Sequence, residues 1–248
     1  MKEFWLPASM LFRRELLGFW REKSRVAAFV GTPFLFWIVV GSGYSNFGKF
    51  LPGALLLTLM FSAIFSAMTL IEDRREGFLL SALASPAPRS AIVFGKVAGS
   101  AVIAAVQGLL FYLLASLGGT LYGEVSWVAL LGQIALCSLG FTAAGFWMAW
   151  RINSTQGFHA MINLVFVPLW MVSGALFSFA DANTWIGWLM RLNPLSYALQ
   201  ALGMAMGFPS EAPLLVSEIA APVVAVTVAV LLAAATMEIN RQSERSLS

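Results

Sequence analysis

Long apolar stretches, separated by short polar segments, run along most of this chain. Six of them cover residues 26–45, 50–71, 97–117, 127–150, 157–180 and 219–238. Each is long enough to span a membrane, since a helix needs about 20 apolar residues to cross about 30 Å of hydrocarbon. Their backbones must be helical, because lipid offers no hydrogen-bond partner to an open strand or loop. The sequence therefore predicts an all-α integral membrane protein with six transmembrane helices.

Composition leads to the same class of protein. Hydrophobic residues make up 59% of the chain and charged residues 11%, whereas an ordinary globular protein carries about 25% charged residues. So few charges could not cover a surface that faces water. No linker or change of composition divides the sequence, so we expect one transmembrane domain over residues 1–248. No basic run with interleaved aromatics is present, which argues against a nucleic-acid partner.

Two segments differ from the six apolar stretches. Residues 1–25 predict an amphipathic helix lying in the membrane interface, because one helical face gathers Trp5, Phe12, Leu16, Phe19 and Trp20. Residues 181–213 are too short and too interrupted for two spans, with Asn193-Pro194 in their middle. There we expect one or two short re-entrant helices that dip into the outer leaflet.

The distribution of lysine and arginine predicts the orientation. Thirteen of these residues fall in the N-terminal segment, the loops after the second and fourth stretches, and the C-terminal tail, against only Lys49 and Arg191 on the other side. Loops rich in Lys and Arg stay in the cytoplasm. We therefore expect a multi-pass protein with both termini cytoplasmic.

Residues that could supply chemistry or energy are scarce. The Gly95-Lys96 pair is followed by Val97 and lacks the earlier glycine of a phosphate-binding loop. The apolar stretches hold almost no ionisable groups for ion coupling. One cysteine, Cys137, and one histidine, His159, cannot form a metal cluster or a catalytic triad. The sequence predicts no enzyme, metal or cofactor in this chain, which is then either passive or driven by a partner.

The most informative polar segment is 72–96. It opens with five charged residues, continues with Phe78, Leu79, Ala82 and Leu83 at helical spacing, and then turns at Pro86 and Pro88. This pattern predicts a short amphipathic helix presented to the cytoplasm, of the kind that docks into a groove on a partner protein.

Two motifs resemble those of one family. The stretch EDRREGFLLSALASPAPRSAIVFGK, starting at residue 72, resembles the signature loop of ABC type-2 transporter permeases, which export drugs, polysaccharides and glycolipids. LWMVSGALF, from residue 169, and LNPLSYALQAL, from residue 192, resemble the family's fifth span and the segment before its sixth. The similarity follows the whole chain in order.

The resemblance implies a permease subunit of the bacterial plasma (inner) membrane that pairs with a second copy of itself or a similar permease. A separate cytosolic ABC ATPase would bind ATP and Mg and power export of an amphiphilic cargo (drug, lipid or glycan-lipid). Its contact would be a coupling segment that contains Glu72, Asp73, Arg74, Arg75, Glu76, Gly77, Phe78, Pro86 and Arg89.

The resemblance also implies that the second and fifth spans line the transport route. Candidate residues are Met60, Phe61, Phe65, Met68, Phe166, Trp170, Met171 and Phe177. Flexible methionines and flat aromatic rings can repack around cargoes of different shape, including membrane lipid. Ordinary helix packing is the other explanation for this set, and an ATP-independent channel or a membrane-embedded assembly factor is the alternative function.

Overall fold

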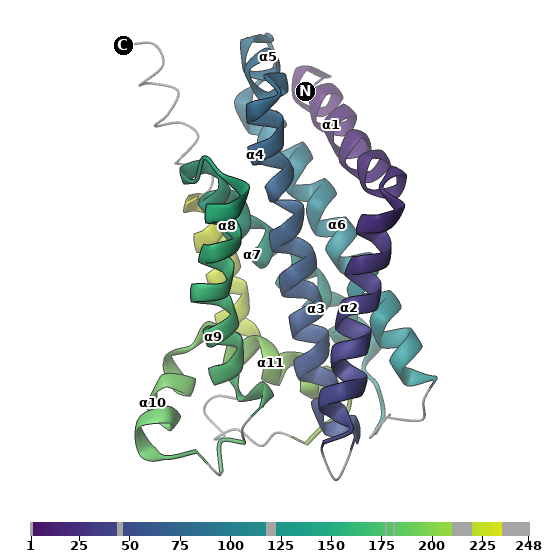
Figure 1. Cartoon of the computed structure of the whole chain (residues 1–248), viewed down its shortest axis with the longest axis vertical. Helices are drawn as coiled ribbons and strands as arrows, with labels where there is room; N and C mark the ends of the chain where they lie inside the picture. Colours follow the sequence, from purple (N-terminus) through teal and green to yellow (C-terminus); the bar gives the residue numbers. More distant parts are fainter. Residues whose placement is uncertain are drawn as a thin grey trace.

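A computed structural model describes residues 2–43, 47–117, 123–176, 178–180, 182–209 and 220–234. Every regular element within these residues is a helix, which confirms the all-α prediction. Figure 1 shows an elongated bundle, with α1 (Lys2–Arg21) leaning against one side near the end that carries α5 (Phe78–Ala84). The short helices α10 (Thr184–Leu192) and α11 (Pro194–Ala205) gather at the opposite end.

Four helices in the described part of the chain are long and apolar enough to cross a membrane. They match the second to fifth predicted stretches. The first of them, Gly48–Arg75, contains α3 (Leu51–Ser66) and α4 (Met68–Arg75). The others are α6 (Arg89–Ser116), α7 (Trp127–Arg151) and the segment Thr155–Ala175.

The first and sixth predicted stretches contain shorter apolar helices. In α2 (Lys23–Gly41) the apolar part is Gly31–Gly41, and near the C-terminus the described helix is Ala220–Ala234. Residues 44–45, 219 and 235–238 of these two stretches lie outside the described residues. Both helices are apolar, and the count of six spans stays a prediction.

Helix α3 forms the centre of the bundle. Its residues are apolar on all sides, a pattern expected of a helix surrounded by others, and 78% of the most apolar window of Gly48–Arg75 is buried. The core around it includes Leu55, Leu59 and Ile64, each with no exposed surface. Helices α2, α6, α7 and α11 pack around α3. The second predicted span is therefore surrounded by protein along most of its length.

The segment Thr155–Ala175 is an irregular helix. Helices α8 (Thr155–Met161) and α9 (Val167–Trp170) alternate with two π-helical turns, η2 (Ile162–Phe166) and η3 (Met171–Ala175). Pro168 contributes to the irregularity, because it lacks the N–H that the helix would bond to residue 164. At Gly174 the backbone turns to a φ of 100°, which ends the helix. This irregularity falls in the predicted fifth span.

The Asn-Pro-Leu-Ser-Tyr motif builds the junction between α10 and α11. Asn193 accepts a hydrogen bond from the backbone N–H of Leu195 (3.0 Å), which caps α11, and its side-chain amide donates to the carbonyl of Leu169 (2.6 Å). The Tyr197 hydroxyl donates to the carbonyl of Arg191 (2.7 Å). Two short helices thus lie where one or two were predicted, and their depth in the membrane stays a prediction.

Candidate functional site

The predicted coupling segment forms a sharp helical corner at one end of the molecule. Helix α4 ends at Arg75, and Gly77 adopts a φ of 77°, a left-handed conformation that glycine takes at little cost. Helix α5 then starts at Phe78, and the Pro86–Pro88 stretch leads into α6. In Figure 1, α5 lies at the extreme end of the bundle, directly beyond α4. The predicted short helix therefore exists and continues from the membrane-spanning helix Gly48–Arg75.

The candidate coupling residues divide into three groups by exposure. Arg75, Glu76 and Pro86 are exposed, whereas Asp73 is buried. The half-buried ones are Glu72, Arg74, Gly77, Phe78 and Arg89. Only part of the predicted segment is thus presented to a partner, and the rest contacts this chain.

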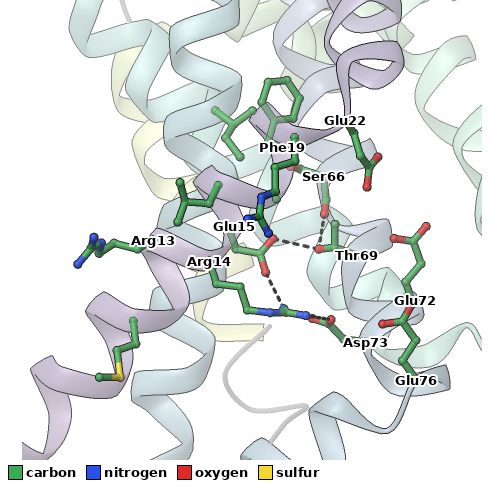
Figure 2. A pocket seen from close by; sticks show the side chains of 15 residues that line it. Arg13, Arg14, Glu15, Phe19, Glu22, Ser66, Thr69, Glu72, Asp73 and Glu76 are labelled. Atoms are coloured by element: carbon green, nitrogen blue, oxygen red, sulfur yellow. Dashed lines mark hydrogen bonds and ion pairs between the residues drawn. The ribbon is translucent and has the colours of Figure 1, made fainter.

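Asp73 belongs to a cluster of charges that we call the ionic hub: Glu15, Asp73 and Lys96, which are buried, and Arg14, whose side chain is 41% exposed. The Lys96 ammonium lies 2.5 Å from Oε1 of Glu15 and 2.5 Å from Oδ2 of Asp73, and its side chain is only 1% exposed. Arg14 donates two hydrogen bonds to the Asp73 carboxylate, at 2.7 and 3.0 Å. Figure 2 shows Arg14 reaching past Glu15 to Asp73. The hub therefore joins α1, α4 and α6.

Arg14 extends the hub to the coupling helix. Its guanidinium lies 3.7 Å from the centre of the Phe78 ring, at the start of α5, in cation–π geometry. The hydrogen bond to Asp73 raises the pKa of Arg14, so this side chain stays charged at any physiological pH. Helix α5 is therefore in contact with α1 as well as connected to α4 through Gly77.

Two glycines of α6 allow α1 to approach closely enough for the hub to form. A Cβ atom on Gly95 would lie 2.5 Å from the carbonyl oxygen of Ala8, and one on Gly99 would lie 2.9 Å from Cβ of Glu15. Helix α1 buries Ala8, Leu11, Glu15 and Phe19. Phe19, predicted to face the membrane, thus turns toward the protein, while Trp5 and Trp20 are exposed as predicted.

Sequence reasoning missed Glu15 and Lys96 as partners. Lys96 was expected to be a loop charge that sets orientation, yet it lies about two turns inside α6, and Glu15 interrupts an otherwise apolar face of α1. A lysine and a glutamate that both fall on apolar helix faces are a usable signal, because a charge buried alone is very unfavourable.

Arg74 points the other way, to the C-terminal end of α7. It donates to the carbonyl oxygens of Ala149 (3.0 Å) and Trp150 (3.2 Å) and to the side-chain oxygen of Asn153 (2.9 Å). The last carbonyls of a helix have no partner within it, and a cation there also interacts favourably with the helix dipole. Within this chain, Arg74 is a structural residue.

Replacing Arg74 by glutamine should therefore destabilise the fold. We expect a loss of about 2 kcal/mol in the free energy of unfolding, because hydrogen bonds from a charged donor to two carbonyls disappear. Thermal unfolding of the detergent-purified protein measures the effect. Arg75→Gln is the matched control, since Arg75 is exposed. Equal midpoints for the two variants would show that Arg74 does not stabilise α7.

Among the candidate route residues, Phe65 and Trp170 connect α3 with the segment Thr155–Ala175. The rings of Phe61 and Phe65 stack at 5.3 Å, and the His159 ring lies 5.1 Å from Phe65. Phe61, Phe65 and Met68 are half-buried, Met171 is exposed, and Met60, Phe166 and Trp170 are buried. Phe177 lies outside the described residues.

Trp170 has a packing role. Its indole N–H donates to the carbonyl oxygen of Gly53 (3.0 Å), and its ring meets Phe36 and Phe50 edge to face. The side chain therefore ties α9 to α3. Met60, also buried, lies in the core. Ordinary helix packing thus accounts for these two members of the set, whereas Phe61, Phe65 and Met171 keep surface that a cargo could contact.

Comparisons with known proteins agree with the sequence motifs. The family model described as ABC-2 type transporter matches residues 8–207. The protein named "Putative transport permease ycf38" of Porphyra purpurea is 25% identical over 207 residues, covering 77% of this chain and 71% of that protein. Its counterpart in Pyropia yezoensis is 26% identical over 205 residues, covering 77% and 70%. The matched region includes the ionic hub, the corner at Gly77 and both candidate route helices. This chain belongs to the ABC-2 type transporter family.

Proposed function

We propose that this chain is the membrane-spanning permease subunit of an ATP-driven exporter whose ATPase is a separate cytosolic protein. It would span the bacterial plasma membrane six times, with both termini and α5 in the cytoplasm. Arg74 and Arg75 end α4 next to α5, and Arg14 contacts Phe78 at the start of α5, which supports this orientation. The cargo would be an amphiphilic drug, lipid or glycan-lipid.

The observation that carries the proposal is the exposed corner formed by α4, Gly77 and α5. It extends from the long helix Gly48–Arg75, which is interrupted only by one turn residue, Ala67. Arg75 and Glu76 at the corner are exposed and charged. Charges on such a surface steer a partner and fix its register. A push on this corner passes directly into a predicted route helix.

The exposed apolar surface of the helix Thr155–Ala175 supports pairing with a second permease subunit. Only 33% of its most apolar window is buried, the lowest share among the four long apolar helices of the described residues, and Leu164 is 73% exposed. Met171 lies on the same helix and is also exposed. We infer that this helix and α3 line the route together with their counterparts in a second copy of this chain or a similar permease.

Three hydroxyl groups that could line a passive channel already donate hydrogen bonds within the described part of the chain. Thr58 donates to the carbonyl of Ala54 (2.8 Å), Ser62 donates to the side chain of Gln107, and Ser173 donates to the carbonyl of Trp170 (2.7 Å). All three residues are buried. These side chains therefore do not favour an aqueous pore through α3 and η3.

Cross-linking to the partner tests the proposal. The chain would be affinity-purified from its own membranes after Cys137→Ser and the introduction of a single cysteine at Arg75, Ser81 or Trp185. We expect a cross-link to an ATPase from Arg75→Cys and Ser81→Cys, and none from Trp185→Cys, which lies on α10 at the opposite end (Figure 1). After salt removes the partner, the remaining chain should hydrolyse no ATP. Hydrolysis by the pure single chain would refute the separate ATPase.

Coupling is tested by Glu72→Ala and Arg75→Ala. We expect both variants to insert and dimerise normally, yet to lose most export per molecule and to stimulate the partner ATPase less. Export normalised to the amount of protein in the membrane is the measurement. If these residues only anchor the helix end at the headgroups, protein abundance should fall while normalised export stays normal.

A further inference from the structure

One strongly polar side chain lies exposed inside the apolar helix Thr155–Ala175. Asn163 is exposed and belongs to the π-helical turn η2, a kind of irregularity that is frequent at functional sites. It lies eight residues after Thr155, about 12 Å along the helix axis, and therefore well inside hydrocarbon about 30 Å thick. In Figure 1, α8 and α9, which flank η2, form the edge of the bundle opposite α1. The amide is thus on an outer surface of this chain, at membrane depth.

The exposed surface of this helix has a polar side and an apolar side. Gln156, His159 and Asn163 are all exposed and are spaced by three and four residues, so they share one side of the helix. Met161 and Val165, which are 41% and 37% exposed, each lie two residues from Asn163 and point to the opposite side. Lipid chains are a suitable environment for the apolar side, but not for the polar one.

Of the three polar residues, Asn163 depends most on a partner outside this chain. Gln156 and His159 lie within about 6 Å of Thr155, where headgroups and water are near, and the His159 ring also contacts Phe65. The described residues form no hydrogen bond with the Asn163 amide. An amide without a hydrogen bond is strongly unfavourable in hydrocarbon. Another polar group must therefore cover Asn163 in the membrane.

An asparagine can satisfy the hydrogen bonds of an identical asparagine. Its side chain carries both a donor and an acceptor, so two copies of it can pair reciprocally. In a dimer with two-fold symmetry, a residue near the axis meets its own counterpart. Ala160, one turn before Asn163, is exposed, and its small side chain lets two helices approach closely. The surface around Asn163 is thus complementary to itself.

We propose that Asn163 forms a reciprocal hydrogen bond with Asn163 of a second copy of this chain, across a two-fold axis beside η2. The inference rests on the proposed pairing of permease subunits, and it names the partner as an identical chain and Asn163 as the residue that sets the register. Leu164, which is 73% exposed beside Asn163, packs in the same contact. Met161 and Val165, on the opposite side of the helix, face lipid.

Disulfide cross-linking tests the contact. The full chain with Cys137→Ser carries one new cysteine, either Asn163→Cys or the matched control Val165→Cys, and its native membranes are oxidised with copper phenanthroline. We expect a dimer of this chain from Asn163→Cys and none from Val165→Cys, because a disulfide needs Cα atoms less than about 7 Å apart. Cross-linking at both positions, at neither, or at Val165 alone would overturn the proposal. A cross-link from Asn163→Cys to a different permease would overturn the identical partner and leave the proposed pairing of permease subunits intact.

The dimer affinity tests the hydrogen bond itself. Asn163→Leu should raise the Kd of the dimer about three- to twentyfold, the range found for interhelical hydrogen bonds in membranes. Asn163→Gln keeps a self-complementary amide and should stay near the unaltered chain, as should the control Val165→Leu. Energy transfer between labelled copies in liposomes measures the Kd without any ATPase, and thermal unfolding checks that each variant is folded. Dimerisation of Asn163→Leu as tight as that of the unaltered chain would overturn the proposal.

Discussion

Replacing Lys96 by methionine should be among the most damaging single changes in this protein. The substitution leaves the carboxylates of Glu15 and Asp73 buried, at 5% and 6% side-chain exposure, without the ammonium that lies between them. Removing one partner of a buried ion pair typically lowers the free energy of unfolding by about 3–5 kcal/mol, because the remaining charge is uncompensated. Thermal unfolding in detergent and the amount of folded protein in the membrane measure the loss.

A double variant distinguishes the stability lost through unbalanced charge from the stability lost through changed packing. Lys96→Met combined with Glu15→Gln should recover at least half of the loss, because neutralising Glu15 leaves Asp73 with its two hydrogen bonds from Arg14. The part of the unfolding free energy that is not recovered reflects the methionine, which fills the space of the lysine but offers no hydrogen-bond donor. If the single and double variants unfold at the same temperature, the charge balance of the hub is not what stabilises this junction.

A methyl group on Gly95 should separate α1 from α6. The new Cβ of Gly95→Ala would lie 2.5 Å from the carbonyl oxygen of Ala8, an atom of the α1 backbone that cannot rotate away. Overpacking of this kind lowers the free energy of unfolding by about 1–3 kcal/mol, and we expect the upper end because a displaced α1 also strains the hub.

The matched control for this change is Gly132→Ala in α7. Nothing lies within 4 Å of a Cβ built on Gly132, and alanine favours a helix over glycine by up to about 1 kcal/mol. The two variants make the same chemical change inside a helix, yet Gly132→Ala should be neutral or stabilising. Equal effects of the two alanines on the unfolding midpoint would contradict the close approach of α1 at Gly95.

Apolar periodicity and length were enough to predict the helices that cross the bundle. Residues 127–150 correspond closely to α7, and 97–117 to the C-terminal part of α6, which starts eight residues earlier at Arg89. A span is recognised by length and hydropathy, both local properties of the sequence. The short helix α5 was also predictable, since charged, apolar and proline-containing segments follow one another there, whereas the turn at Gly77 was not predicted. Residues 26–45 and 219–238 hold shorter apolar helices, and their membrane crossing stays a prediction.

The partners of the coupling residues were not predictable in the same way. Asp73 and Arg74 are adjacent in the sequence, yet Asp73 faces α1 and α6 while Arg74 faces the end of α7. Adjacent helical residues point about 100° apart, so each meets a different neighbour. Which neighbour it meets depends on how helices pack, and that is decided by small residues such as Gly95 far away in the sequence.

The ionic hub holds the helix Gly48–Arg75 at Asp73, so a rigid tilt of this helix would pivot there. Gly53 lies 20 residues away, about 30 Å along the helix axis. A tilt of about 5° around Asp73 would move the distant arm by about 2.6 Å, from the same helical rise. That displacement is enough to break the 3.0 Å hydrogen bond between the Gly53 carbonyl and Trp170. A small rotation at the α5 end would thus separate α3 from α9 at the other end of the bundle.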